Sequence, residues 1–261
     1  MPRFAANLTM LFTDYPMVER IDRAAEAGFS GIEFLFPYQE DVDGIQEALK
    51  RNGIQQVLFN LPAGDFAGGE RGIANNPDRT QEFRDGVQKA LEIAAKLDCP
   101  KLNCLSGLAL DGVPWETQWN TLIENYQHAA EETAKAGVLQ LVEPINTFDM
   151  PGFTVPTTNH GLKLINAVGH QNLKLQYDVY HMQRMEGDVI ATIREYAPHF
   201  GHVQIADPPS RTQPGTGEVA FERVLDALVD SGYAGYIGLE YKPTPGLDPF
   251  AWLQTLGQGQ G

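Results

Sequence analysis

The stretch HVQIAD at residues 202–207 has the apolar residues of a buried strand, yet a histidine and a glutamine stand among its first three positions. Side chains alternate along a strand, so His202 and Gln204 point to one side of the sheet, while Val203 and Ile205 point to the other. A buried imidazole or amide is costly unless something bonds it. The polar face of this strand therefore needs a binding partner inside the fold.

HVQIAD is one of eight short apolar runs that recur fairly evenly along the chain, with helix-like segments between them. The runs are RFAANL at 3–8, GIEFLF at 31–36, QVLFN at 56–60, KLNCL at 101–105, LQLVEP at 139–144, LKLQYD at 173–178, HVQIAD and YIGLEY at 236–241. Helical patterns cover 18–28, 83–97, 121–137 and 221–232, and several end in glycine. Eight strand–helix units in about 250 residues predict an α/β fold, the (β/α)8 TIM barrel, rather than an open doubly wound sheet.

No biased linker divides the 261 residues. We therefore expect a single barrel domain over residues 1–257 and a flexible glycine-rich tail at 258–261. The longest stretches without a helix or strand pattern, 61–78 and 146–153, each follow a predicted strand. In a barrel these would be loops over the mouth of the active site.

The net charge of −15 argues against nucleic acid as a partner, because binding to a phosphate backbone is driven by clustered Lys and Arg. The N-terminal stretch makes a poor signal peptide, and no window approaches the roughly 18 apolar residues of a membrane span. Cys99 and Cys104 are too few for a disulfide framework, so we expect reduced thiols and a cytoplasmic protein. A small molecule is the expected partner, and the oligomeric state stays open, a homo-oligomer included.

Four polar residues stand near the carboxyl ends of the last four predicted strands: Glu143, Asp178, Gln204 and Glu240. Each comes from a consecutive strand, so all four can converge on one rim of the barrel. A single acidic residue at a strand end is more often a helix cap or a solvated loop residue, but three facing carboxylates need protonation or a cation. Three carboxylates and an amide oxygen suit Mg²⁺ or Mn²⁺ better than zinc or copper.

Several longer motifs resemble the hydroxypyruvate isomerase family, within the xylose-isomerase-like barrel superfamily. They are LVEPIN at 141–146, YDVYHMQRMEGD at 177–188, GHVQIADPPSRTQPGTGE at 201–218 and GLEYKP at 238–243, and the similarity extends through FAANLTMLF at 4–12 and NLPAGDFAGGERGIA at 60–74. The resemblance implies a TIM barrel that holds a divalent metal through Glu143, Asp178, Gln204 and Glu240. It also implies that Glu143 and Glu240 transfer protons and that His181 reaches the substrate.

Related sugar epimerases of the wider superfamily usually carry a histidine where Gln204 stands. The substitution agrees with the narrower family and favours oxygen-loving metals over zinc. The expected reaction converts hydroxypyruvate to tartronate semialdehyde (2-hydroxy-3-oxopropanoate) through an enediolate, with Glu143 and Glu240 as base and acid.

A short hydroxy-keto acid substrate brings a carboxylate, which needs a cation in this acidic protein. Arg71, Arg211 and Lys242 all lie on loops at the expected mouth, and at least one should bind that carboxylate, although each alone is more often a surface charge. His202 is a candidate neighbour of Gln204. The other histidines, His128, His160, His170 and His199, lie in or beside helical segments, where surface or packing roles are expected.

Three other reactions remain open at this point. A 2-oxotetronate isomerase differs by one carbon, which changes discrimination by only about 1–3 kcal/mol. A ketose C3-epimerase could use the same metal and glutamates to return the proton to the opposite face. An abasic-site DNA nuclease shares the barrel, but it would need a histidine-rich zinc cluster and a basic groove.

Overall fold

A computed structural model describes residues 2–256 of the chain. The strands are β1 (Arg3–Asn7), β2 (Gly31–Glu33), β3 (Gln55–Asn60), β4 (Lys101–Cys104), β5 (Leu139–Val142), β6 (Leu173–Asp178), β7 (Phe200–Ile205) and β8 (Tyr236–Leu239). The helices are α1 (Met17–Glu26), α2 (Val42–Asn52), α3 (Thr80–Leu97), α4 (Trp115–Lys135), α5 (Thr158–Val168), α6 (Val179–Met185), α7 (Val189–Tyr196), α8 (Phe221–Asp230) and α9 (Ala251–Leu256), with 3₁₀ turns η1 (Pro77–Arg79) and η2 (Ala197–His199).

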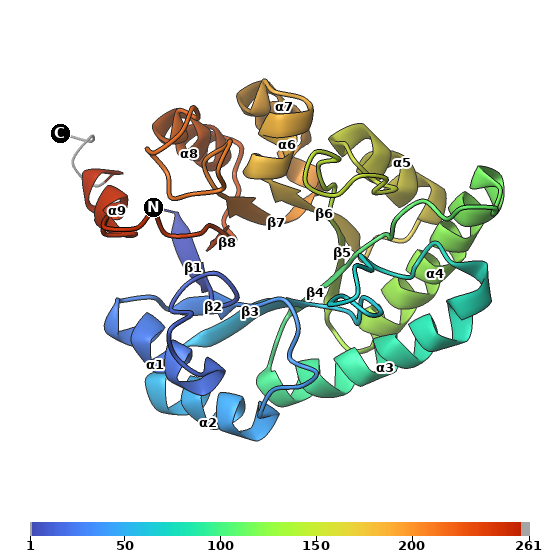
Figure 1. Cartoon of the computed structure of the whole chain (residues 1–261), viewed down its shortest axis with the longest axis horizontal. Helices are drawn as coiled ribbons and strands as arrows, with labels where there is room; N and C mark the ends of the chain where they lie inside the picture. Colours follow the sequence, from blue (N-terminus) through green and yellow to red (C-terminus); the bar gives the residue numbers. More distant parts are fainter. Residues whose placement is uncertain (1, 257–261) are drawn as a thin grey trace.

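The eight strands form one closed parallel barrel in sequence order, and β8 closes the ring by pairing with β1. Figure 1 shows the helices outside this ring, with α9 beside the start of β1. The (β/α)8 fold predicted from the spacing of the apolar runs is therefore confirmed. The proposed tail at 258–261 lies outside the described residues, and the described part contains no helix long and apolar enough to cross a membrane.

The helices pack on the ring through apolar stripes that their sequences encode. In α3 the buried positions include Phe83, Val87, Ala90 and Ala94, which recur at the three- and four-residue spacing of one helix face. The helix α2 begins at a cap where Asp41 accepts the backbone N–H of Gly44, and it ends at Gly53 in the left-handed conformation (φ 62°). Such stops return the chain to the next strand.

The carboxyl ends of the strands set the positions of the predicted acids. Glu143 and Glu240 each lie one residue beyond β5 and β8, and Asp178 is the last residue of β6. Strand β7 begins at Phe200 and ends at Ile205, so Asp207 belongs to the loop that follows it. These side chains stand at the end of the barrel where TIM-barrel active sites lie.

The interior of the barrel holds both apolar and charged residues. A small apolar cluster includes Ala5, Leu141 and Tyr236. On β8, Gly238 lies on the same face as Tyr236 and one step nearer the mouth. A Cβ at Gly238 would lie 2.3 Å from Glu33 Oε1, so glycine leaves space for a buried carboxylate in the middle of the barrel.

Candidate active site

Acidic side chains from three strand ends meet at the mouth of the barrel. Glu143, Asp178 and Glu240 are all buried, with at most 5% of each residue exposed. Asp178 also caps α6, because its Oδ1 accepts the backbone N–H of Tyr180 at 2.9 Å. Convergence of these acids agrees with the arrangement expected from the sequence.

His181 completes a cluster with two of these acids. One oxygen of Glu143, one oxygen of Asp178 and a ring nitrogen of His181 all lie within 4.8 Å of one another. His181 Nε2 is 3.6 Å from Asp178 Oδ2 and 3.9 Å from Glu143 Oε1. His181 lies in the short helix α6, directly after the strand that carries Asp178.

Arg211 supplies the positive charge at this cluster. Its Nη2 lies 3.1 Å from Glu240 Oε2 and 3.4 Å from Asp178 Oδ2, and its guanidinium lies over the Tyr180 ring with 5.0 Å to the centroid. Burial opposes the charge on Arg211, but Glu240, Asp178 and Glu143 outweigh it and raise the guanidinium pKa. Arg211 is therefore a permanent cation between two strand ends.

One arginine does not neutralise three buried acids. Burial, together with repulsion from Glu240 and Asp178, raises the pKa of Glu143 well above its usual value. Burial raises the pKa of Glu240 to about 8 and that of Asp178 to about 6, although Arg211 lowers both. The cluster therefore holds protons at neutral pH unless a further cation enters.

A second cation fits this donor set. The cluster combines hard carboxylate oxygens with raised proton affinity, and a divalent ion would replace those protons. Glu143 and Asp178 lie close enough to hold it together. Glu240 and Gln204 are the other two ligands expected from the sequence.

Glu143 has one carboxylate oxygen held and the other turned towards the cluster. Asn103 on β4 donates its Nδ2–H to Glu143 Oε2 at 2.8 Å, and the same Nδ2 lies 3.2 Å from the side-chain oxygen of Asn60. Glu143 Oε1 is the oxygen that faces His181. A proton can be exchanged at Oε1 without disturbing the bond from Asn103.

Gln204, which is paired with Asp178 in the register of β6 and β7, takes part in a buried network. Its side-chain oxygen accepts from Gln176 Nε2 at 2.6 Å, and its NH₂ donates to Glu33 Oε1 at 2.7 Å. The same carboxylate of Glu33 accepts from Asn7 Nδ2 at 3.0 Å and contacts His202 Nε2 at 2.6 Å. His202 therefore reaches Gln204 through Glu33, and the polar face of HVQIAD is bonded to a carboxylate from the opposite part of the sequence.

The loop that carries Arg211 is tied to the barrel by Asp207. Its two carboxylate oxygens accept the backbone N–H groups of Gly215, Thr216, Gly217 and Val219 at 2.8–3.1 Å. The backbones of Asp207 and Thr212 also exchange two hydrogen bonds. Lys242 donates its backbone N–H to the carbonyl of Arg211 at 2.9 Å, so the loop is held from both sides.

The other predicted cations do not join the cluster in the same way. The side chain of Lys242 is exposed, and its backbone makes the contact to Arg211. Arg71 Nη1 donates to the carbonyls of Phe66 and Glu70, and its guanidinium lies over the Phe66 ring. Arg71 lines a separate hollow of about 300 Å³ between its own loop and residues 108–111.

Sequence reasoning missed several residues of the site. Glu33, Asn103, Asn146 and Asp207 were not assigned roles, although each is a buried polar residue in or just after an apolar run. Glu33 is the one charged residue within GIEFLF, and that contrast was the available signal. The histidines set aside as surface or packing residues, His128, His160, His170 and His199, are half-buried or exposed on or beside helices.

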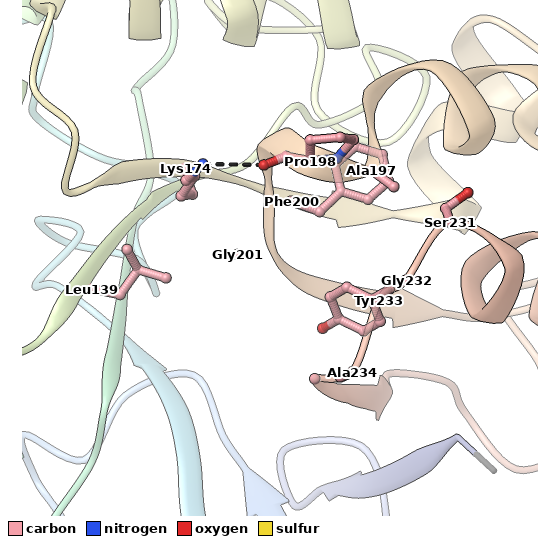
Figure 2. Close-up of a pocket in the computed structure, with 11 residues that line it drawn as sticks. Leu139, Lys174, Ala197, Pro198, Phe200, Gly201, Ser231, Gly232, Tyr233 and Ala234 are labelled. Atoms are coloured by element: carbon pink, nitrogen blue, oxygen red, sulfur yellow. Dashed lines mark hydrogen bonds between the residues drawn. The ribbon is translucent and has the colours of Figure 1, made fainter.

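A hollow of about 360 Å³ lies at the opposite end of the barrel, where β5, β6 and β7 begin (Figure 2). Among its lining residues Lys174 is the charged one, and its Nζ donates to the carbonyl of Pro198 at 3.1 Å. Leu139, Phe200 and Tyr233 are among its lining residues in Figure 2. This face of a TIM barrel usually serves stability, and the acidic cluster belongs to the other end.

The family model described as xylose isomerase-like TIM barrel matches residues 21–256. The chain is 49% identical over 243 residues to hydroxypyruvate isomerase of Escherichia coli (strain K12), covering 93% of this chain and 94% of that protein. It is 39% identical to 2-oxo-tetronate isomerase of Cupriavidus necator, covering 97% and 98% of the two chains.

Solved structures show the same barrel. A structure described as AP endonuclease, family 2, from Brucella melitensis superposes with a TM-score of 0.94 at 44% identity, over 98% of this chain and 99% of that chain. D-psicose 3-epimerase of Clostridium cellulolyticum H10 superposes with a TM-score of 0.77 at 19% identity, over 100% and 93% of the two chains. At that identity the epimerase is similar in fold alone.

Proposed function

This chain belongs to the xylose isomerase-like TIM barrel family, and from that membership we propose that it is a metal-dependent isomerase of small hydroxy-keto acids. Its proposed reaction interconverts hydroxypyruvate and tartronate semialdehyde. The identity to the E. coli hydroxypyruvate isomerase supports this choice of substrate.

The observation that carries the proposal is the buried meeting of Glu143, Asp178 and Glu240 around Arg211. Buried carboxylates at the mouth of the barrel are groups that can take up and return a proton. A fixed arginine suits a substrate carboxylate, which it can bind through two parallel hydrogen bonds. Isomerisation of a keto acid needs both the carboxylates and the arginine. Packing of a hydrophobic core needs neither.

The reaction moves one proton between neighbouring carbons. A proton leaves C3 of hydroxypyruvate and returns to C2, while the hydroxyl proton passes from the oxygen on C3 to the oxygen on C2. An enediolate lies between the two states. A bound divalent cation would supply Lewis-acid stabilisation of the negative charge that develops on those oxygens.

Glu143 and Glu240 are the groups proposed to remove and return the carbon-bound proton. Glu143 Oε1 is free of the bond that holds Oε2 to Asn103, so it can accept a proton without leaving its place. Glu240 follows β8, whereas Glu143 follows β5. These strands are not neighbours in the ring, so Glu240 can act from another side of the substrate. Asp178 keeps its role at the start of α6 and serves as a ligand.

The nearest alternative is the four-carbon acid. The C. necator relative is named for 2-oxo-tetronate, and one added carbon changes binding by only about 1–3 kcal/mol. The nuclease description of the Brucella structure gives DNA as a further substrate to test. The net charge of −15 argues against it, because phosphate backbones are bound by clustered cations.

A substrate panel tests the proposal directly. The purified protein is stripped with a chelator and assayed on hydroxypyruvate, 2-oxotetronate, neutral ketoses and an abasic DNA duplex, without metal and with Mg²⁺ or Mn²⁺. We expect metal-restored turnover with the highest kcat/KM on hydroxypyruvate. Equal turnover of neutral ketoses, cleavage of the duplex, or full activity in a verified metal-free sample would overturn the proposal.

A further inference from the structure

The side-chain amide of Asn146 has its orientation fixed by Asp149. Asn146 Oδ1 accepts the backbone N–H of Asp149 at 2.9 Å, and Asn146 Nδ2 donates to Asp149 Oδ2 at 3.0 Å. An exchange of the amide nitrogen and oxygen would place two oxygens together and two N–H donors together. The nitrogen of this amide is therefore assigned by its neighbours.

That nitrogen also faces His181. Asn146 Nδ2 lies 2.6 Å from His181 Nδ1, and the backbone nitrogen of Asn146 lies 3.4 Å from the same ring atom. Both atoms of Asn146 are N–H donors, so His181 Nδ1 must accept and must carry the lone pair. The single proton of the neutral ring then resides on Nε2, the nitrogen that faces Glu143 and Asp178.

We propose that Asn146 is a positioning residue that fixes His181 as the Nε2–H tautomer, so that His181 donates a hydrogen bond to a substrate oxygen and is excluded from metal coordination. A ring nitrogen that carries a proton has no lone pair for a metal. The cluster of Glu143, Asp178 and His181 therefore works as two oxygen ligands and one hydrogen-bond donor. The substrate part of this assignment rests on the proposed isomerase function.

Asp149 is itself held, so the amide of Asn146 has no free alternative. Tyr180 donates its hydroxyl to Asp149 Oδ2 at 2.6 Å, and Arg184 Nη1 donates to Asp149 Oδ1 at 2.8 Å. Tyr180 directly precedes His181 in α6, and Arg184 follows in the next turn. The helix α6, which carries His181, therefore also holds Asp149, and Asp149 orients the amide that determines which ring nitrogen of His181 is protonated.

A polarity exchange tests the assignment while keeping shape and charge. In the double variant Asn146→Asp, Asp149→Asn the carboxylate at 146 accepts the amide of 149 and also accepts from His181, which then requires the proton on Nδ1. Imidazole ¹⁵N NMR of the ¹⁵N-labelled protein distinguishes the two nitrogens, and the His181→Gln variant identifies the His181 signals by their loss. We expect the proton on Nε2 in the parent and on Nδ1 in the exchange variant.

Metal binding supplies a second measurement that needs no turnover. Freeing Nε2 should raise the affinity for Zn²⁺ by about tenfold or more, the size of effect that residues behind a metal ligand commonly have, with a smaller change for Mg²⁺. Asn166→Asp, on the exposed side of α5, makes an Asn→Asp change away from the site and should leave both the His181 signals and the Zn²⁺ affinity unchanged.

The results separate the tautomer from the reaction. A parent protein with the proton on Nδ1, or an exchange variant whose tautomer and Zn²⁺ affinity both match the parent, would overturn the assignment to Asn146. A loss of at least about tenfold in kcat on hydroxypyruvate in the exchange variant, alongside the NMR change, would support the donor role. A parent inactive on every hydroxy-keto acid would overturn the proposed function and leave the tautomer result standing.

Discussion

Arg211 Nη2 lies 3.1 Å from Oε2 of Glu240, so the acidic cluster already contains a cation that belongs to the protein. The same nitrogen is 3.4 Å from Asp178 Oδ2, which a divalent ion would also approach. Metal and arginine therefore act on the same carboxylates, and each affects the binding of the other.

Replacing Arg211 with Met should change two affinities in opposite directions. Removal of a positive charge a few ångströms from the carboxylates should tighten Mn²⁺ binding at least about tenfold. Loss of a charged contact to the substrate carboxylate should lower kcat/KM on hydroxypyruvate. The loss of transition-state stabilisation that this ratio measures should be about 2–4 kcal/mol. Calorimetric titration with Mn²⁺ and steady-state kinetics check the two effects. If the Mn²⁺ affinity and kcat/KM were both unchanged, Arg211 would have no role in binding the metal or the substrate.

Replacing Glu143 or Glu240 with Gln should stop proton transfer. Each variant keeps an oxygen but cannot take up a proton at neutral pH, so kcat should fall at least about a hundredfold. The parent enzyme in D₂O should place deuterium on the product carbon, read by NMR or mass spectrometry. One variant is expected to wash deuterium into unreacted substrate while forming no product. Complete retention of the original hydrogen in the parent would instead indicate a hydride shift.

Gln204→His tests whether Gln204 is a metal ligand. An imidazole is a softer donor than an amide oxygen, so the variant should shift preference from Mg²⁺ towards Co²⁺ and Zn²⁺. Metal competition followed by elemental analysis measures the shift. An unchanged profile would leave Gln204 with the role its contacts to Gln176 and Glu33 describe, that of a buried structural amide.

Glu33→Gln should destabilise the fold. The carboxylate of Glu33 bonds Asn7, Gln204 and His202 in the middle of the barrel, and an amide cannot accept all three. The cost should be about 2 kcal/mol in the free energy of unfolding, measured with urea. Glu47→Gln on the exposed side of α2 is the matched control and should stay within about 0.5 kcal/mol of the parent. Equal stability of the two variants would contradict the network.

Stability of the metal-free protein should depend on pH through the acidic cluster. Burial raises the pKa of Glu240 to about 8, whereas an unfolded glutamate titrates near about 4.3. The folded state therefore binds the proton more tightly than the unfolded state does. The contribution of this proton to the free energy of unfolding is complete below about pH 4 and is lost as the pH rises towards 8. Protonation of Asp178 also stabilises the fold at low pH. Because its pKa is about 6, this contribution is lost over a narrower range of pH.

Thermal melts between pH 6 and 9 check this dependence. The metal-free parent should lose Tm as the pH rises, and saturating Mg²⁺ should flatten the slope because it replaces the protons. Glu240→Gln carries no such proton and should show a smaller slope. A metal-free Tm that rises over this range would contradict the assignment.

The barrel could be predicted because its information is local. Each strand–helix unit carries its own apolar run and helix stripe, and LKLQYD coincides with β6. Glu143, Asp178 and Glu240 could be grouped because equivalent positions of successive units must share one rim. Boundaries were less accurate: GIEFLF shortens to Gly31–Glu33, where a bulge against β3 interrupts the pairing.

Contacts between distant parts of the sequence could not be predicted. Glu33 contacts His202 inside the barrel, and the sequence around neither residue indicates that the other is its partner. The proton on His181 depends on Asn146, whose amide is in turn oriented by a loop residue, Asp149. The contacts of Glu33 depend on the closed ring, which brings side chains of β2 and β7 together in the barrel interior.

The four backbone N–H bonds to Asp207 restrict the movement of the loop that carries Arg211. The loop backbone is tied to the end of β7, so the reach of the guanidinium is determined by the side chain of Arg211. If the proposed function holds, a substrate that contacts both this guanidinium and Glu143 has to fit between the two side chains. A longer acid would then call for a different arm length or loop spacing on the same barrel.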